Sequence, residues 1–219
     1  MISKETLYKN ALRAIEDIYE QSKYDKDVDL YRSFDIMNFV NDSQMQSKEW
    51  LVDTLSQYFD KKYLKEPLRD VLIMGSWYGM TSILLRKYVD LEVKIWNIDS
   101  DPLCEKYGNM LKQDLEGCEH NWFRTDDALE YYFDRTGAFQ LIINTSCEHM
   151  EPEDLKLILS MKPLDTMVCF QSNNMKSEAE HINTHNSINE FVESLNLARV
   201  FFADTFKYHD YERYMVIGV

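Results

Sequence analysis

The sequence predicts an α/β fold: a Rossmann-like, doubly wound and mostly parallel sheet, with an antiparallel pair of strands at its C-terminal end and a helical extension at its N-terminal end. From residue 70 onward, apolar runs of strand length alternate with amphipathic helical patterns, as in a parallel sheet with right-handed crossovers. The last two β-rich runs, 198–206 and 212–219, are separated by five residues, too few for a helix. They must therefore pair antiparallel, either as a hairpin or with one strand inserted.

Two helical patterns precede this region. In residues 5–22 apolar side chains recur at intervals of three and four, and a second such pattern covers 47–58 after the polar run 41–46. The polar run is either a helix cap or a segment that folds over a bound ligand. We assign residues 1–66 to a helical extension, or lid, packed on the core. Three of its side chains are candidates for contact with cofactor or substrate: Gln46, Lys48 and Trp50.

Residues 67–219 are predicted to form the Rossmann-like domain, a single globular unit. The expected strands are 70–74, 92–98, 121–124, 139–144 and 166–171, and the expected helices are 80–89, 102–114, 127–134, 152–160 and 187–195. Because helices separate consecutive parallel strands, the carboxyl ends of these strands should meet along one edge of the sheet. Open α/β sheets bind their ligands at that edge.

The segment 70–81 is the part of the chain around which we expect the site to form. Its apolar run ends at Gly75, Gly79 follows four residues later, and a helical pattern begins at once. This order is typical of a strand, a tight turn and a helix. The next predicted strand is followed by Asp99, 24 residues after Gly75. Asp99 can therefore occupy the acid position of a nucleotide-binding βαβ unit, where a carboxylate suits a ribose diol.

Composition limits the class of protein and of partner. The 219 residues are 45% hydrophobic, which suffices for a packed core, and 38 acidic against 24 basic residues give a formal charge of −14. Such a charge gives no general attraction for nucleic acid or an anionic membrane surface, so nucleic acid is the poorer candidate partner and no membrane partner is expected. The four cysteines have no CxxC spacing and no positively charged leader precedes an apolar segment. We therefore expect a cytoplasmic protein without disulfides or a membrane span.

The order of five strand–helix units and an antiparallel terminal pair resembles that of the class I S-adenosylmethionine-dependent methyltransferases. Four segments carry the resemblance: 71–79, 98–102, 125–128 and 141–150. In that family the first glycine loop holds the amino-acid portion of S-adenosylmethionine, an acid after the second strand binds ribose, and an acid after the third strand binds adenine. By similarity, the implied cofactor-binding residues are Gly75, Ser76, Trp77, Tyr78 and Gly79 in the loop, Asp99 and Ser100 at the ribose, Asp126 or Asp127 with Ala128 at the adenine, and Asn144 after the fourth strand.

Two positions depart from the pattern of the family. Ile73 stands where an acidic residue usually contacts the ammonium group of the cofactor, so a carboxylate from elsewhere has to take that role. Trp77 stands where a further glycine is frequent. Because the pyrophosphate of NAD needs that glycine for a close approach to the backbone, Trp77 also argues against a dinucleotide dehydrogenase.

Chemistry is expected at the ends of the fourth and fifth strands, where the polar runs 144–149 and 171–174 follow buried strands. These polar groups need partners. Either they bind one another and cap the next helix, or together they form a substrate pocket, which we favour. Methyl transfer is an in-line displacement that depends on positioning, with a base only for a protonated acceptor. The candidate catalytic residues are His149 and Glu148 as bases, Asn144, Gln171 and Asn173 as orienting groups, and His181 from the loop after the fifth strand.

No metal site is predicted. His181 and His185 have the i, i+4 spacing that holds a metal on a helix, but no cysteine pair or third ligand accompanies them at a telling interval. Cys147, beside Glu148 and His149, is either a thiol nucleophile or, as is commoner for cysteine, a buried and inert side chain.

The predicted function is that of an S-adenosylmethionine-dependent methyltransferase acting on a small-molecule or peptide-like acceptor. Two alternatives stay open: a scaffold that binds the cofactor without catalysis, and an enzyme that cleaves S-adenosylmethionine or transfers another part of it. A scaffold has no need of the polar runs 144–149 and 171–174, so these runs favour an enzyme.

Overall fold

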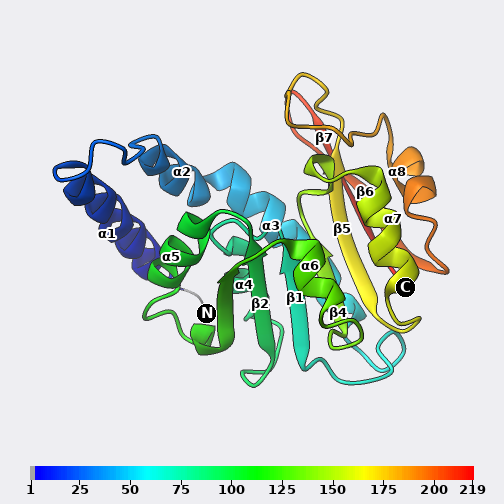
Figure 1. Ribbon diagram of the computed structural model, residues 1–219. Helices are drawn as coiled ribbons and strands as arrows, with labels where there is room; N and C mark the ends of the chain where they lie inside the picture. Colours follow the sequence, from blue (N-terminus) through cyan, green and yellow to red (C-terminus); the bar gives the residue numbers. More distant parts are fainter. Residues whose placement is uncertain (1–2) are drawn as a thin grey trace.

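The computed structural model describes residues 3–219 and is built on one seven-stranded sheet (Figure 1). Its strands are β1 Asp70–Met74, β2 Lys94–Asp99, β3 Asn121–Thr125, β4 Leu141–Asn144, β5 Met167–Asn173, β6 Val200–Lys207 and β7 Glu212–Gly218. The strand order is β3-β2-β1-β4-β5-β7-β6, with β1 to β5 parallel to one another. β6 and β7 pair as an antiparallel hairpin, and β7 is inserted between β5 and β6. The predicted fold class is therefore confirmed.

Helices cover both faces of the sheet. The α-helices are α1 Lys4–Ser22, α2 Arg32–Phe39, α3 Asp42–Leu55, α4 Met80–Leu85, α5 Pro102–Leu111, α6 Ala128–Phe133, α7 Pro152–Met161 and α8 Ile188–Leu195. In β1, Leu72 and Met74 belong to the core under α6, α7 and α8, whereas Val71 and Ile73 belong to the core under α3 and α4. Successive side chains of a strand point to opposite faces, and both faces are buried here, so all four residues are apolar.

The N-terminal helices contact α4, α5 and the loop after β1. α1 packs against α2 and α5, and α3 packs against α4. Phe39, at the end of α2, is fully buried, and its ring centroid lies 6.1 Å from that of Trp77 and 6.0 Å from that of Tyr78. The N-terminal helices therefore support the β1–α4 loop directly. Residues 1 and 2 of the expected extension 1–66 lie outside the described residues.

α2 is a helix that the sequence analysis did not predict. Two of its eight residues, Ile36 and Phe39, are buried, so its short pattern carries little periodicity. The polar run 41–46 forms the start of α3. The side chain of Asn41 caps this helix by accepting a hydrogen bond from the backbone N–H of Gln44 at 2.8 Å. The helix-cap interpretation therefore accounts for the run.

Several predicted boundaries are wrong, and two of them have a clear physical cause. The helix expected over 80–89 ends at Leu85, because the amides that follow bond three residues back, as from the N–H of Arg86 to the carbonyl of Ile83. The strand expected over 166–171 extends to Asn173, because β7 pairs with it as far as that residue. Within residues 3–219, no helix combines the length and the apolar character needed to cross a lipid bilayer.

The loop after β1 rests on Phe123 of β3. The ring of Phe123 is 2% exposed and fits between two glycines, since a Cβ on Gly79 or on Gly108 of α5 would come within 2.4 or 2.3 Å of it. Gly79 also has a φ of +82°, in the left-handed region that favours glycine. This close packing against Phe123 fixes the position of the β1–α4 loop relative to β3.

Candidate functional site

A cavity of about 310 Å³ lies at the carboxyl ends of β1, β2 and β4. The strand order reverses between β1 and β4, which is the place where open α/β sheets bind ligands. The cavity is lined by Met74, Gly75, Asp99, Ser100, Asp127, Ala128, Leu129, Asn144, Ser146, His149, Met150, Glu151, Asp154 and Ile182. The predicted cofactor-binding residues among these are Gly75, Asp99, Ser100, Asp127, Ala128 and Asn144.

Gly75 forms the wall of the cavity at the end of β1. Its φ of +57° lies in the left-handed region, and a Cβ built on it would stand 3.5 Å from the Cβ of Ser146, at ordinary contact distance. Ser146 lines the same cavity from the loop after β4. The missing side chain of Gly75 therefore leaves space between two strand ends that a bound ligand can use.

Trp77 has a φ of +50°, which is unusual for a bulky residue. Its backbone N–H donates to Oδ2 of Asp99 at 2.8 Å, and its ring packs against Phe39 and Tyr78. The indole does not line the cavity, so it leaves the space between Gly75 and Asp99 open. The other loop residues predicted to contact the cofactor are buried and do not line the cavity either: Ser76, Tyr78 and Gly79.

The carboxylate of Asp99 faces the cavity from the end of β2 and also holds its own loop. Oδ2 accepts the hydrogen bond from Trp77, and Oδ1 accepts one from the backbone N–H of Asp101 at 3.1 Å. Each carboxylate oxygen has a further lone pair, so Asp99 can still accept the two hydroxyls of a ribose diol. Asp99 and Gly75 thus line one cavity from the ends of two adjacent strands.

Of the two acids after β3, Asp127 lines the cavity and Asp126 does not. Asp127 caps α6, because its side chain accepts hydrogen bonds from the backbone N–H groups of Leu129 and Glu130 at 2.8 and 3.0 Å. Asp126 is exposed, and its backbone N–H donates to the carbonyl oxygen of Asp99 at 3.1 Å. Asp127 is therefore the better placed of the two for a ligand in this cavity.

The wall of the cavity is acidic. Among the lining residues, the four carboxylates are those of Asp99, Asp127, Glu151 and Asp154, and there is no lysine or arginine. Glu151 and Asp154 lie at the start of α7. In the sequence they indicated only the beginning of a helix, not a place in the site. Such a wall favours a cationic ligand and opposes a pyrophosphate.

Glu148, in the loop after β4 and next to the lining residue His149, is a buried carboxylate with one engaged and one free oxygen. Its side chain is 4% exposed. Oε1 accepts a hydrogen bond from Nδ2 of Asn173 at 2.7 Å and lies 3.6 Å from Nη2 of Arg213. Oε2 is buried and has no hydrogen-bond partner among the described residues. Because an unpaired buried polar atom is costly, Oε2 is open to a ligand.

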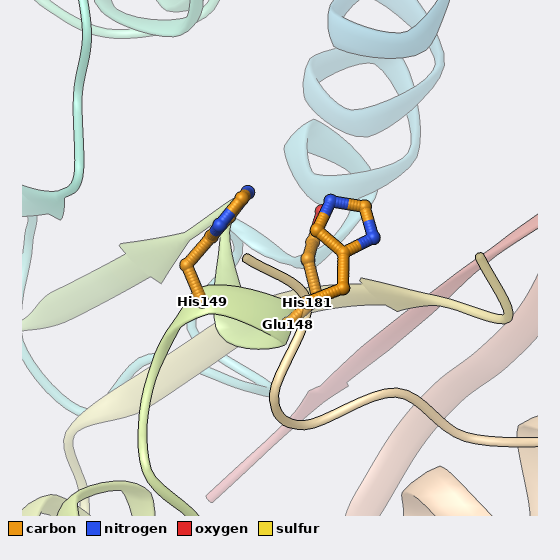
Figure 2. Close-up of side chains that lie close together, drawn as sticks. All are labelled: Glu148, His149 and His181. Atoms are coloured by element: carbon orange, nitrogen blue, oxygen red, sulfur yellow. The ribbon is translucent and has the colours of Figure 1, made fainter. Parts of the chain in front are cut away.

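Figure 2 shows the imidazoles of His149 and His181 beside Glu148. The two ring centroids are 4.7 Å apart, with the rings nearly perpendicular at 85°. Nδ1 of His181 lies 2.9 Å from the carbonyl oxygen of Met175. One atom from each of the three side chains, a carboxylate oxygen and two imidazole nitrogens, lies within 4.8 Å of the others. The loops after β4 and β5 thus bring three potential metal ligands together.

The segment that carries His181 and His185 is an irregular loop and not a helix. The i, i+4 pair considered as a metal site on a helix therefore does not form. His185 is buried with its Nδ1 3.3 Å from Oγ of Ser172, and burial lowers its pKa. His181 meets His149 instead.

Gln171, at the predicted end of the fifth strand, and Asn173, expected beyond it, both lie within β5 and are fully buried. Nε2 of Gln171 is 3.8 Å from Sδ of Met215, and Gln171 does not line the cavity. Asn173 instead contacts Glu148 and sets its position. Cys147 is also fully buried, and burial raises the pKa of its thiol, which fits an inert side chain and not a nucleophile.

Lys48 approaches this group from α3. It is half-buried, and burial, assisted by the charge of Arg213, lowers its pKa to about 7, while Glu148 acts in the opposite direction. Of the other two lid candidates, Gln46 is exposed and Trp50 packs against aromatic rings of β6. The sequence analysis missed Arg213, because no local signal links this residue of β7 to the end of β4.

No protein-family model and no curated protein matches this sequence. Solved structures with a similar fold include a methyltransferase from Geobacter sulfurreducens, which is 11% identical, with a TM-score of 0.56 over 80% of this chain and 78% of that one. The N-methyltransferase NodS from Bradyrhizobium japonicum WM9 is 13% identical, with a TM-score of 0.57 over 81% of this chain and 97% of that one.

A further similar structure is MtNAS in complex with MTA and tNA. It is 13% identical, with a TM-score of 0.56 over 98% of this chain and 70% of that one. The match to MtNAS therefore includes the helices before β1, whereas the two methyltransferases match about four-fifths of the chain. At these identities the likeness establishes the fold, and the chain has the class I methyltransferase fold.

Proposed function

We propose that this chain binds S-adenosylmethionine in the cavity at the ends of β1, β2 and β4, and transfers its methyl group to a small-molecule or peptide-like acceptor. The observation that carries the proposal is that Gly75 and Asp99 line one cavity while Trp77 packs away from it. Solved methyltransferases with the same fold support it. The cavity volume of about 310 Å³ also agrees with the roughly 300–1,000 Å³ usual for small ligands.

The charge of the cavity supports a cationic ligand. S-adenosylmethionine carries a sulfonium and an ammonium group, both of which gain from nearby carboxylates. We assign the ribose to Asp99 and the adenine side to Asp127. The ammonium group is assigned to Glu151 and Asp154, in place of the acid that the chain lacks at Ile73. Ile73 is 1% exposed in the core, where a charge would be costly.

The acceptor is assigned to the side of the cavity formed by Asn144 and His149. Methyl transfer needs the acceptor atom in line with the breaking C–S bond, and the positive charge on sulfur disappears as the new bond forms. Next to His149 in the chain, Glu148 accepts a hydrogen bond of 2.7 Å from Asn173, and this bond keeps the buried groups in place. We therefore give Asn173 and Glu148 positioning roles.

Thermal unfolding with S-adenosylhomocysteine tests cofactor binding. At a ligand concentration 100 times Kd, binding adds about 2.7 kcal/mol to the free energy of unfolding. For a chain of this size that corresponds to a rise in Tm of roughly 5–11 °C. Asp99→Ala should abolish the rise, whereas Asp126→Ala, which changes an exposed acid outside the cavity, should retain it.

Each variant is compared with its own ligand-free Tm, because Asp99 also accepts hydrogen bonds from its own loop. A wild-type protein that shows neither a rise in Tm nor calorimetric heat with S-adenosylmethionine and S-adenosylhomocysteine refutes the proposal. So does an Asp99→Ala variant that responds like the wild type.

A second candidate function is transfer of a part of S-adenosylmethionine other than its methyl group. It is favoured by the match to MtNAS in complex with MTA, a product derived from S-adenosylmethionine, because that match covers 98% of this chain. Mass spectrometry of the nucleoside product separates the two functions. Methyl transfer leaves S-adenosylhomocysteine, whereas transfer of the aminocarboxypropyl group leaves methylthioadenosine (MTA).

A further inference from the structure

We propose that Glu148, His149 and His181 form a binding site for a divalent transition-metal ion, with open coordination positions toward the acceptor side of the cavity (Figure 2). The three residues offer one carboxylate oxygen and two imidazole nitrogens. This donor set is that of catalytic zinc sites with two histidines and a glutamate, and of iron sites with two histidines and a carboxylate.

The carboxylate of Glu148 is held so that one oxygen remains available. Asn173 donates to Oε1, and Arg213 lies 3.6 Å from the same oxygen. Oε2, in a side chain that is 4% exposed, has no hydrogen-bond partner among the described residues. A buried carboxylate oxygen normally has a partner, and a bound cation supplies one.

His181 has the tautomer that metal binding requires. Nδ1 lies 2.9 Å from the carbonyl oxygen of Met175, and a carbonyl can only accept, so Nδ1 carries the proton. Nε2 then presents its lone pair. Metal-binding histidines typically donate their other ring N–H to a carbonyl or carboxylate in this way, which fixes the ring.

The geometry requires one modest movement. The three ligand atoms lie within 4.8 Å of one another. In a tetrahedral zinc site with bonds of about 2.0–2.1 Å, ligand atoms are about 3.4 Å apart, so the widest gap has to close by at most about 1.4 Å. His149 is exposed, and rotation of its side chain can supply that movement. Because His149 also lines the cavity, the open side of the ion faces the acceptor.

The role of the ion in catalysis rests on the proposed function. A divalent ion bound to an acceptor hydroxyl acts as a Lewis acid, lowers the pKa of the hydroxyl and releases its proton to water. The O–CH₃ bond then forms as the C–S bond breaks, and the electron pair of the C–S bond stays on sulfur, which becomes a neutral thioether. The site therefore fits an acceptor that presents a hydroxyl oxygen to a metal.

Calorimetric titration of the metal-free protein with Zn²⁺, without S-adenosylmethionine, tests the site. We expect one ion per chain. His149→Gln and His181→Gln should each weaken binding by at least about 100-fold, since loss of a direct ligand exceeds the effect of about 10- to 100-fold for outer-shell partners. His209→Gln is the matched control, because His209 is exposed on the turn between β6 and β7, and it should bind like the wild type.

Absence of Zn²⁺ binding, or equal affinity in wild type and His181→Gln, overturns the proposal. Visible absorption of bound Co²⁺ gives a second readout, and it should appear in the wild type and vanish in His181→Gln. Since His149 is exposed, the metal-free His149→Gln protein should melt like the wild type, which excludes misfolding as the cause of lost binding. A protein that binds S-adenosylhomocysteine but does not bind Zn²⁺ rejects only the metal site. A protein that binds Zn²⁺ but does not bind S-adenosylhomocysteine rejects only the proposed cofactor.

Discussion

Replacement of Gly75 by alanine separates the role of this residue in binding from its role in folding. At a φ of +57°, an L-residue costs about 1–2 kcal/mol. The reduced entropy of the unfolded chain returns about 0.4–1 kcal/mol. The new Cβ meets Ser146 at 3.5 Å, an ordinary contact distance, so no packing cost is added. The net loss should be about 1 kcal/mol, or about 2–4 °C in Tm.

Gly79→Ala is the matched variant in the same loop. Gly79 has a φ of +82°, so the backbone cost is similar. The added Cβ would, however, stand 2.4 Å from Cζ of Phe123. Phe123 cannot yield easily, because Gly108 closes on the other side of the ring. Overpacking of a core costs about 1–3 kcal/mol, so Gly79→Ala should lose about 2–4 kcal/mol in total.

Calorimetry of binding and of unfolding distinguishes the two variants. In Gly75→Ala the methyl group enters the cavity, and the affinity for S-adenosylhomocysteine should fall at least tenfold, which is about 1.4 kcal/mol. Gly79→Ala should bind like the wild type below its lower Tm, because Gly79 does not line the cavity. If Gly75→Ala binds normally, or loses more stability than Gly79→Ala, the argument from the loop geometry is refuted.

Two further predictions concern titratable groups whose pKa values burial shifts. Burial lowers the pKa of Lys48 from 10.5 to about 7, so between these pH values the unfolded chain holds the additional proton. The free energy of unfolding should therefore rise with pH by up to about 1.4 kcal/mol per pH unit across this window. Urea denaturation of Lys48→Met at several pH values should lack that contribution. If the free energy of unfolding rises equally with pH in the wild type and in Lys48→Met, the prediction is contradicted. The four buried thiols are those of Cys104, Cys118, Cys147 and Cys169, and burial raises their pKa values. They should react with a thiol reagent only after denaturation. Fast reaction of the native protein would count against their burial.

Most of the fold was predictable because its signals are local. A strand buried on both faces is a continuous apolar run, as in β1, and a glycine marks the turn that follows. The end of β5 was not predictable, because Ser172 and Asn173 are polar and have the composition of a loop. They belong to the strand because β7 pairs with their backbone. α2 was missed because a helix of eight residues with two buried side chains leaves little periodicity.

The candidate site was predictable in part for the same reason. Gly75 and Asp99 belong to one βαβ unit, so their spacing along the chain indicates that they share a strand edge. Glu151 and Asp154 gave the signal of a helix start, although they also line the cavity. Arg213 reaches Glu148 from β7, far along the chain. Contacts of this kind depend on strand order, which composition and spacing do not encode.

The sequence by itself determined the alternation of strands and helices and placed Gly75 and Asp99 at one edge of the sheet, because hydrophobic periodicity and turn chemistry act over a few residues. Only the tertiary structure decided that β7 lies between β5 and β6, and that the loop after β5 carries His181 to Glu148 and His149. The physical reason is that strand order and the course of a loop follow from packing of the whole core, to which residues distant in sequence contribute together.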